Sequence, residues 1–528
     1  MVCDVRALVA AGWNAGLRAM MDDPAIASGF PVGRYDTALL RSVRPMEWRN
    51  PVPRGTYNLV VIGAGPAGLV AARGAAAFGA KVALIERHLI GGDCLNVGCV
   101  PSKALIRTSR LYADMRNAAH FGVTPPASVD VDFSLAMERM RRLRERIGES
   151  DSVWRMATEG VDVFFGQARF AGPDRIEVAG AELRFAKALI ATGARPKLPD
   201  IAGLVDAGYL SNETVFDLTK RPQSLLVIGG GPVGCEMAQV FCRLGSRVIL
   251  AQDEPMFLPG EERDAAQILS VSLARDGVEI HLNSKVVAVR AKDGRKEADL
   301  LREGSISTVT VDEILTGIGR APAVDGLDLA VAGVEATDHG ITVDDFMRTS
   351  NRRIFAAGDV CLKHKFTHTA EATARIALQN ALFFGRKRLS RQVIPWCTFT
   401  DPEIAHVGLY PFDARQAGIP VRTFTILMHD VDRAVTDGKE EGFIKLHVRQ
   451  NDDRILGATV VARHAGELIN GISLAIGSGM GLSALAKVIH SYPTQAVAIR
   501  MAANAYERTR LTPLVHRIAS RWLALLRR

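Results

Sequence analysis

Residues 57–86 read YNLVVIGAGPAGLVAARGAAAFGAKVALIE. The apolar, β-branched opening breaks into glycines, an alanine-rich segment follows, and a second apolar run closes the stretch, which predicts a strand, a turn, a helix and a strand. This context favours a dinucleotide site, because glycines at the spacing GxGxxG let the backbone approach a pyrophosphate at a helix N-terminus. Glu86, at the end of the second predicted strand, would accept hydrogen bonds from a ribose. The fingerprint glycines are Gly63, Gly65 and Gly68.

The same pattern returns at residues 224–252, SLLVIGGGPVGCEMAQVFCRLGSRVILAQ. Gln252 stands where the first unit has its acid. An acid there favours a free ribose 2′-hydroxyl and an arginine favours a 2′-phosphate, so Gln252 decides neither. The neighbouring Asp253 and Glu254 would repel a phosphate, which tips the prediction towards NADH and leaves NADPH open. Two fingerprints in one chain suit an enzyme with one flavin and one nicotinamide. The second set of glycines is Gly229, Gly231 and Gly234.

A pair of cysteines follows the first unit directly, in GGDCLNVGCVPSKALI at residues 91–106. Cys94 and Cys99 are five positions apart, which on an ideal helix would point their side chains about 140° apart. A disulfide between them therefore needs a distorted backbone, which Gly98 makes easy. Cys99 would lie at the start of the next helix, where the helix dipole stabilises a thiolate. A zinc site would need two further ligands, and neither a second CxxC nor an HxxxH appears, so we expect no metal here. Two inert cysteines are the alternative to a redox pair.

Length and composition narrow the class of protein. The chain has 528 residues, of which 48% are hydrophobic and 23% charged, which predicts a globular protein of about three domains. The net charge of +8 is not gathered into a basic stripe with aromatic residues, so nucleic acid is not an expected partner. No uncharged apolar run reaches about 18 residues. Residues 1–16 carry an early acid and only a short apolar run, so we expect no secretory signal and a cytoplasmic protein.

The cysteine motif is similar to that of the class I pyridine nucleotide-disulfide oxidoreductases, the group of dihydrolipoamide dehydrogenase, glutathione reductase and mercuric reductase. The resemblance runs from about residue 56 to 505, and the residues of the cysteine motif are most similar to those of the mercuric reductase branch. FTDPEIAHVG, at residues 399–408, resembles the dimerisation domain of the family. The resemblance implies bound FAD, contacted also by residues of later motifs: Thr192, Gly193, Gly358 and Asp359. Gly319, after the predicted strand in EILTGIGRAP, is a further candidate for cofactor binding.

The resemblance also implies roles for single residues. Cys99 would be the charge-transfer thiol beside the flavin, and Cys94 the interchange thiol that attacks the substrate. Lys103 matches a lysine near flavin N5, and Glu236 matches its ion-pair partner. A cation near N5 would stabilise a reduced, anionic flavin. For Lys103 and Glu236, ordinary solvated or structural positions on helices are the alternative.

We therefore expect an α/β fold with two Rossmann-like dinucleotide-binding domains, for FAD and NAD(P), and a C-terminal α+β dimerisation domain. A homodimer is implied because the family's site borrows residues from the partner chain. For the basic amphipathic tail we favour packing on its own chain or on a partner subunit over contact with a membrane surface. The expected parts are an N-terminal extension at 1–55, the FAD-binding domain at 56–200 and 321–392, the NAD(P)-binding domain at 201–320, the dimerisation domain at 393–510 and the tail at 511–528.

One segment departs from the family pattern. The disulfide reductases place an acid–base histidine before Pro-Thr and a glutamate five residues later, whereas here Tyr492 and Val497 hold those places and His490 stands two residues early. The ordinary pKa of tyrosine, about 10, makes it a poor base at neutral pH. A tyrosine here resembles the mercuric reductase branch, but that branch adds a C-terminal cysteine pair. No cysteine follows Cys397, and the N-terminus has only Cys3.

The expected function is transfer of electrons from NAD(P)H through FAD and the Cys94–Cys99 disulfide to an acceptor, in the manner of a mercuric reductase. The acceptor could be a small-molecule disulfide, a thiol-bound metal ion or a quinone. Dihydrolipoamide dehydrogenase is the alternative enzyme. A flavin redox sensor or electron-transfer module is the alternative outside catalysis.

Overall fold

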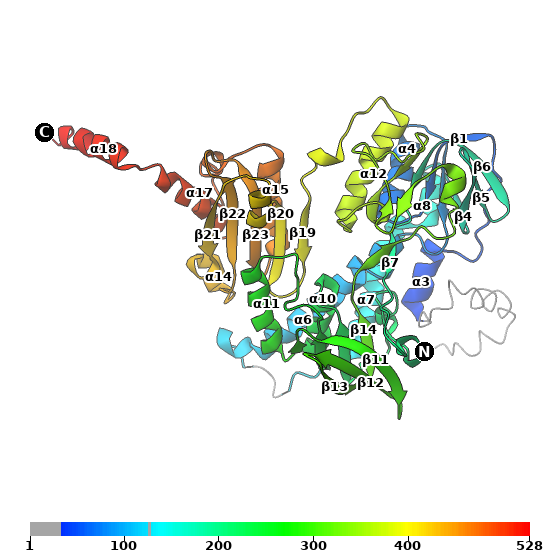
Figure 1. Ribbon diagram of the computed structural model, residues 1–528, viewed down its shortest axis with the longest axis horizontal. Helices are drawn as coiled ribbons and strands as arrows, with labels where there is room; N and C mark the ends of the chain where they lie inside the picture. Colours follow the sequence, from blue (N-terminus) through cyan, green and yellow to red (C-terminus); the bar gives the residue numbers. More distant parts are fainter. Residues whose placement is uncertain (1–32, 125–127, 528) are drawn as a thin grey trace. The chain divides into compact units, whose positions relative to one another are not determined.

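The computed structural model describes residues 33–124 and 128–527 (Figure 1). Residues 1–16, where we expect no secretory signal, and Cys3 lie outside the described residues. The chain forms two compact units. Of the described residues, the first takes in those up to Gly229 together with Val240–Asp253 and Asn283–Arg391, and the second takes in Gly230–Gln239, Glu254–Leu282 and those from Gln392 onward.

The predicted strand–helix–strand is present at the centre of the first unit. Strand β1 (Thr56–Ile62) leads into helix α4 (Pro66–Ala77) and strand β2 (Val82–Glu86), and the two strands pair in parallel. They belong to a seven-stranded sheet of order β3-β2-β1-β6-β5-β4, in which β18 also pairs with β6. The other strands are β3 (Val161–Phe165), β4 (Ala168–Gly172), β5 (Arg175–Val178), β6 (Ala181–Ile190) and β18 (Ile354–Ala356). All five residues of β2 are buried, as expected for a central parallel strand.

The second predicted strand–helix–strand fingerprint is also present. Strand β8 (Ser224–Ile228), helix α10 (Pro232–Arg243) and strand β9 (Arg247–Ala251) follow one another, and β8 pairs in parallel with both β9 and β14 (Glu313–Thr316). An antiparallel three-stranded sheet lies between β9 and β14 in the sequence. Its strands are β11 (Lys285–Lys292), β12 (Arg295–Arg302) and β13 (Ser305–Val311). The two Rossmann-like units of the predicted α/β fold are therefore confirmed.

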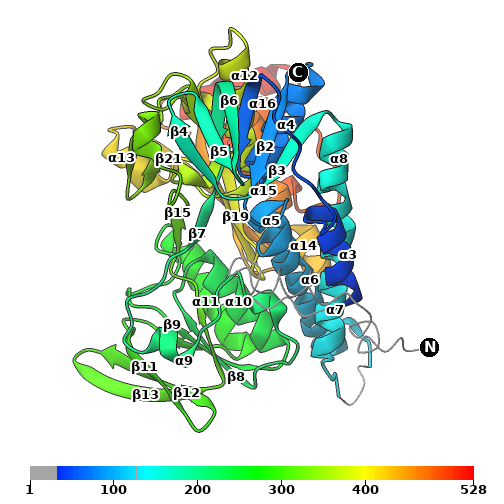
Figure 2. The ribbon, with the colours of Figure 1, turned by 90° about the vertical axis from the view of Figure 1, so that its right-hand side faces the viewer.

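The helices of the first unit that bear on the site come from three parts of the chain. Helix α6 (Cys99–Arg116) packs side by side with α7 (Phe133–Gly148), as Figure 2 shows, and α12 (Thr367–Leu382) packs on α4. Helix α3 (Arg34–Val43), which also packs on α7, lies in the N-terminal extension and was not predicted. Shorter helices are α5 (Gly92–Asn96), α8 (Val153–Thr158) and α9 (Leu204–Ala207).

The second unit holds the predicted α+β domain. Its five-stranded antiparallel sheet has the order β19-β20-β23-β22-β21. The strands are β19 (Pro395–Thr398), β20 (Glu403–Gly408), β21 (Val421–Leu427), β22 (Phe443–Arg449) and β23 (Ile455–Ala462). Helices α15 (Ala465–Gly477) and α17 (Val497–Thr509) pack on this sheet and share its apolar core. The remaining helices are α11 (Arg263–Asp276), α13 (Pro411–Gln416), α14 (Asp432–Thr436) and α16 (Leu482–Leu485).

The predicted basic tail is helical, as α18 (Pro513–Leu525). It buries no residue, and Ile518 and Trp522 are exposed. The helix is therefore not packed on the other elements of its own unit, and its packing elsewhere on the chain or on a partner subunit stays a prediction. Throughout residues 33–124 and 128–527, no helix combines the length and the apolar character that crossing a membrane requires.

Candidate active site

Each glycine of the first fingerprint has its own structural reason. Gly63 has φ +100°, and a Cβ there would lie 2.4 Å from the carbonyl oxygen of Ala191. A Cβ on Gly68 would lie 1.8 Å from the carbonyl oxygen of Gly63, so this glycine allows α4 to pack against the turn. A Cβ on Gly65 would meet only Gly92 Cα, at 3.8 Å. Gly65 therefore leaves open space at the N-terminus of α4, which suits a pyrophosphate.

Glu86 ties the end of β2 to this turn. Its carboxylate accepts hydrogen bonds from the backbone N–H groups of Ala64 and His88, each at 2.7 Å. Burial raises the pKa of Glu86, while these two hydrogen bonds act in the opposite direction. The carboxyl group is therefore fixed beside the glycine turn, where the predicted ribose contact would be made.

The second fingerprint has the same turn geometry. Gly229 has φ +103°, and a Cβ there would lie 2.8 Å from the carbonyl oxygen of Gly317. Gly231 directly precedes α10, and Gly234 lies in the first turn of this helix. Gln252 is buried just after β9, and its backbone carbonyl accepts from Ser284 N–H. The preference for NADH stays a prediction.

The helix is interrupted between the two cysteines, as expected. Cys94 lies in α5 and Cys99 is the first residue of α6. Gly98 separates them with φ −136° and ψ −113°, and a Cβ there would lie 2.7 Å from the carbonyl oxygen of Asp93. A Cβ on Gly92 would lie 2.7 Å from Gly65 Cα, so this cysteine turn, residues 91–99, packs directly on the first fingerprint.

The two thiols share a proton network. The structure has both cysteines as thiols, and a hydrogen bond with Cys99 is the main cause that raises the pKa of Cys94, followed by burial. Cys99 Sγ lies 3.4 Å from Thr367 Oγ1, at the first residue of α12. The N-termini of α6 and α12 both favour a negative charge at this sulfur. The arrangement therefore favours a thiolate on Cys99 and a retained proton on Cys94, and the disulfide of the oxidised state stays a prediction.

Arg320 joins three of the predicted motifs, although the sequence prediction missed it. Its guanidinium bonds to the Asp93 carboxylate in the cysteine turn and to the Ala194 carbonyl oxygen, and its Nε lies 3.8 Å from Asp359 Oδ2. Burial acts to lower the pKa of Arg320, but the charge of Asp93 and its hydrogen bond raise it overall, with help from Asp359. The position directly after Gly319 was the available signal.

The later glycines predicted to bind a cofactor also lie in the first unit. Gly193 (φ +71°) and Gly319 (φ +104°) have open space where a Cβ would stand. Gly358 (φ +77°) lies against α4, since a Cβ there would be 3.5 Å from Ala67 Cβ. Thr192 Oγ1 donates to the carbonyl oxygen of Ala323 at 2.7 Å. Burial raises the pKa of Asp359, as expected for a carboxylate enclosed in this site.

Lys103 and Glu236 lie in different units. Lys103 is on α6 in the first unit, and Glu236 is on α10 in the second. Glu236 is buried, and its Oε1 accepts a hydrogen bond of 2.9 Å from the backbone N–H of Phe399. The predicted ion pair between Lys103 and Glu236 stays a prediction.

The segment that departs from the family pattern lies at the surface of the second unit. Tyr492 is 70% exposed, and its hydroxyl donates to Asp432 Oδ2 at 2.9 Å. This hydrogen bond raises the pKa of Tyr492, so even less of the phenolate, the basic form, is present near neutral pH. His490 has its Nδ1 3.1 Å from the carbonyl oxygen of Val488, and Val497 begins α17. Catalytic roles for Tyr492 and His490 stay predictions.

Two imidazoles missed by the sequence prediction flank Thr367. The rings of His364 and Phe366 stack at 6.3 Å, and those of Phe366 and His368 at 5.4 Å. Burial lowers the pKa of His364. The histidine-rich run KHKFTH, residues 363–368, was the available signal. The structure therefore places ionisable rings next in the chain to the threonine that contacts Cys99.

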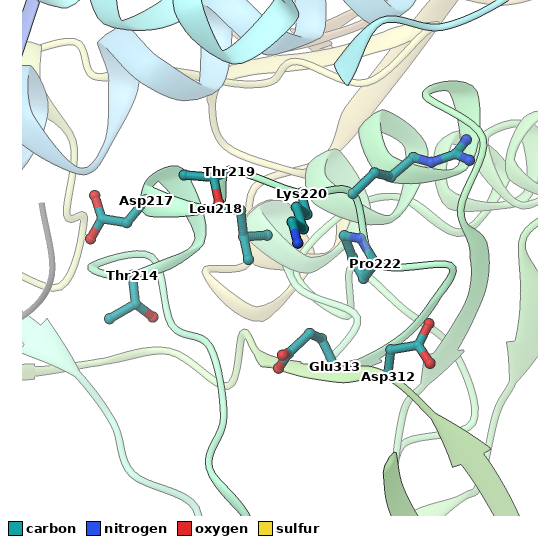
Figure 3. A pocket seen from close by; sticks show the side chains of 9 residues that line it. Thr214, Asp217, Leu218, Thr219, Lys220, Pro222, Asp312 and Glu313 are labelled. Atoms are coloured by element: carbon teal, nitrogen blue, oxygen red, sulfur yellow. The ribbon is translucent and has the colours of Figure 1, made fainter. Parts of the chain in front are cut away.

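A separate pocket of about 400 Å³ lies in the first unit (Figure 3). It contains none of the predicted site residues. Burial raises the pKa of Asp217 in its wall to about 7. The lining residues are Thr214, Asp217, Leu218, Thr219, Lys220, Arg221, Pro222, Asp312 and Glu313.

No cluster of three or more metal-binding side chains occurs within residues 33–124 and 128–527.

Two family descriptions match the sequence. Residues 57–375 match the pyridine nucleotide-disulphide oxidoreductases, and residues 394–503 match the dimerisation domain of these enzymes. A mercuric reductase of Lysinibacillus sphaericus is 32% identical over 90% of this chain and 87% of its own length. A dihydrolipoyl dehydrogenase of Thermus scotoductus is 35% identical over 85% of this chain and 97% of its own length.

Solved structures give the same assignment. The Cu(II) complex of the HOCl-induced flavoprotein disulfide reductase RclA from Escherichia coli is 27% identical, with a TM-score of 0.77, over 86% of this chain and 100% of that chain. LpdA from Mycobacterium tuberculosis is 28% identical, with a TM-score of 0.78, over 85% of this chain and 99% of that chain. The likeness therefore extends over both dinucleotide-binding units and the dimerisation domain.

The open space at Gly65 gives a first prediction. Gly65→Ala should leave the fold intact, because φ −76° suits alanine and the new Cβ meets only Gly92 Cα at 3.8 Å. The methyl group should weaken FAD binding roughly ten- to hundredfold, the cost of disturbing one hydrogen bond to a charged phosphate. Titration of the apoprotein with FAD, followed by flavin fluorescence, measures this affinity.

Gly260→Ala is the matched control, because Gly260 is exposed and has nothing within 4 Å of a new Cβ. We expect wild-type FAD affinity in this variant and wild-type melting temperatures in both apoproteins. Equal FAD affinity in Gly65→Ala and wild type would contradict a phosphate site at this turn.

Proposed function

The chain belongs to the pyridine nucleotide-disulphide oxidoreductase family, and we propose that Cys94 and Cys99 are its redox pair, which passes electrons to a thiol-reactive acceptor. The chain is a flavin-dependent enzyme of the mercuric reductase and lipoamide dehydrogenase type, and its cofactors are FAD and NAD(P)H. One observation supports the assignment of the cysteines above the others. The backbone breaks at Gly98 between them, and the turn that carries both packs on the FAD fingerprint, where a Cβ on Gly92 would lie 2.7 Å from Gly65 Cα.

The residues around the first fingerprint suit FAD. Gly65 and the N-terminus of α4 would face its pyrophosphate, Glu86 its ribose, and Asp359 its ribityl chain. When bound, FAD supplies a two-electron relay between the nicotinamide and the cysteine pair. Overall, NAD(P)H and a proton reduce one disulfide to two thiols, and the oxidised nicotinamide leaves.

The environments of the two sulfurs divide the work between them. Thr367 and two helix N-termini stabilise a thiolate on Cys99, the role of the charge-transfer thiol. Cys94, whose pKa is raised, keeps its proton in the resting dithiol. Loss of this proton to a base or to solvent would make Cys94 the sulfur that attacks an acceptor.

The departure at Tyr492 and Val497 favours acceptors that need no proton shuttle. Reduction of a small disulfide protonates a leaving thiolate, and general acid–base help of this kind is worth roughly 10²–10⁴-fold. A phenol with a raised pKa gives little such help near pH 7. When a thiol-bound metal ion, as the names of the mercuric reductase relatives suggest, accepts two electrons, its thiol ligands leave as thiolates. Solvent can protonate these thiolates after they have left the metal, so the step needs no positioned acid. A quinone remains a further candidate.

A homodimer is supported by the match of residues 394–503 to the family's dimerisation domain. We propose that residues 490–497 serve the cysteine pair of a partner subunit, and that α18 packs on that subunit. Contact of α18 with a membrane surface is the alternative. We expect a cytoplasmic location. The alternative enzyme is a dihydrolipoyl dehydrogenase, like the relative that is 35% identical.

The cysteine variants test the proposal. NADH should support reduction of Hg(II) or a disulfide dye by wild type, while Cys94→Ser and Cys99→Ser should each lose at least about 10²-fold, as expected for members of one catalytic unit. Reduced Cys94→Ser should keep the long-wavelength absorbance of a thiolate against flavin, and Cys99→Ser should lose it. Stopped-flow spectra and steady-state turnover measure the two effects. Full activity in both variants would refute the assignment.

The same turnover assay measures the preference for NADH or NADPH. We expect a higher kcat/KM for NADH than for NADPH, because Asp253 and Glu254 would repel a 2′-phosphate. Comparison of the two cofactors at a saturating acceptor concentration decides it. A tenfold preference for NADPH, equal to about 1.4 kcal/mol, would overturn this expectation.

Restoring the family pattern tests the acceptor preference. Wild type should turn over dihydrolipoamide and glutathione disulfide poorly but reduce its flavin normally. Tyr492→His with Val497→Glu should raise turnover of the disulfides by up to about 10²-fold, since the pair would supply an acid–base group. Turnover of both substrates is compared with the rate of flavin reduction, which should not change. Efficient lipoamide turnover by wild type, unchanged in the double variant, would mean that the departure has no mechanistic consequence.

A further inference from the structure

The N-terminal extension reaches the cysteine turn through a buried ion pair. Asp36 in the first turn of α3 accepts a 2.7 Å hydrogen bond from Arg144 Nη2 on α7, and the two side chains are 2% and 0% exposed. The other terminal nitrogen of Arg144 donates a 2.8 Å hydrogen bond to the carbonyl oxygen of Asn96. Asn96 is the last residue of α5 and lies between the two cysteines. One guanidinium therefore connects the extension to the redox turn.

The Asn96 carbonyl is a point where the turn needs support. The last carbonyls of a helix have no partner within the helix, and α5 ends where the backbone breaks at Val97 and Gly98. The side chain of Asn96 also donates to the carbonyl oxygens of Ile90 and Gly92, at 3.1 and 2.9 Å. Arg144 completes this set, so Asn96 is fixed from both its backbone and its side chain.

Apolar packing supports the same contact. Leu39 of α3 is 1% exposed and shares a core with Leu95, the neighbour of Cys94. A Cβ on Gly148 of α7 would lie 2.6 Å from Leu39 Cδ1 and 3.5 Å from Leu95 Cδ2, so the three elements meet closely. Helix α3 therefore contacts the turn both through a charged pair and through a leucine.

The rest of the extension holds the neighbouring backbone. Arg44 Nη1 donates to the carbonyl oxygens of Arg87 and His88, both at 2.6 Å, directly after Glu86. The carbonyl oxygen of Val43 accepts from Ile90 N–H at 3.2 Å. Val43 and Arg44 precede the region matched by the family description, which begins at residue 57.

We propose that Asp36 and Arg144 are positioning residues for thiol–disulfide chemistry, and that α3 is a clamp that sets the geometry of the Cys94–Cys99 turn. A buried ion pair is a poor device for stability, because desolvation offsets most of its attraction, but it is directional. Because Asp36 fixes the orientation of the Arg144 guanidinium, the second hydrogen bond of this group fixes the position of the Asn96 carbonyl. This inference rests on the redox role proposed for the two cysteines.

The test uses holoenzyme reduced with dithiothreitol and two substitutions. Asp36→Asn removes the charge that faces Arg144, and Arg144→Lys keeps a buried cation but lacks the fork that reaches both Asp36 and the Asn96 carbonyl. Met156→Ala is the control: Met156 is fully buried in the same core, and no hydrogen bond joins it to the turn. The measurements are the alkylation rates of Cys94 and Cys99 with iodoacetamide, by mass spectrometry, and the equilibrium constant for disulfide exchange with dithiothreitol.

We expect both clamp variants to change the ratio of the two alkylation rates and the exchange constant by about tenfold, since displacement of a reacting group by about 1 Å costs up to about 10²-fold. Flavin reduction by NADH should stay within about twofold of wild type, because it precedes the thiol steps. Met156→Ala should lower the melting temperature and leave the ratio and the exchange constant unchanged.

Clamp variants that lose thermal stability like Met156→Ala, with a wild-type alkylation ratio and exchange constant, would overturn the proposal. Should Asp36→Asn fail to fold, Arg144→Lys decides by the same two measurements. Both measurements work without an electron acceptor. A wild type that fails to reduce any acceptor would therefore refute the proposed function and still leave the clamp to be judged.

Discussion

Gly92 in the cysteine turn lies so close to the backbone of the dinucleotide turn at Gly65 that no side chain fits at residue 92. A methyl group on Gly92 would overlap Gly65, and one on Gly63 would overlap the segment that begins at Ala191. Only glycine at residue 92 allows this approach, which brings the cysteine turn directly against the turn that carries the dinucleotide fingerprint. This close approach of the two turns constrains the residues of the cysteine turn, the start of α6 and the position of α12.

Charge is then arranged around this contact. Arg320 links Asp93 in the cysteine turn to Asp359 near α12, and Arg144 links the turn to α3. Both guanidinium groups have several planar N–H donors, so each can hold two or three oxygens at once. The Arg144–Asp36 pair is buried, so breaking it would leave a charge in a site where water enters poorly, whereas the Arg320–Asp93 pair is partly exposed. The cysteine turn is therefore held on two sides by arginine.

Local pattern predicted the parts of this site that lie close together in the sequence. Glycine spacing, the acid at the end of β2 and the cysteine pair each sit in one short motif, so a single stretch carried the evidence. Thr367, Arg320 and Arg144 could not be found in this way, because each reaches the cysteine turn from far along the chain and none belongs to a periodic pattern. Helix α3 was missed because its short amphipathic stretch follows a segment of mixed character. The surface that covers the tail could not be predicted, because the burial of a helix depends on its tertiary partner.

The segment after α3 also closes an open edge. Strand β3 is the last strand on its side of the sheet, and its outward-facing backbone groups at Val163 and Phe165 bond to side chains instead of another strand. The amide of Asn50 donates to the carbonyl oxygen of Phe165 and accepts from its N–H, as a neighbouring peptide group would, and Trp48 Nε1 donates to Val163. An edge satisfied in this way offers no template for strand addition, so in the folded chain the extension protects this edge of the sheet from edge-to-edge aggregation.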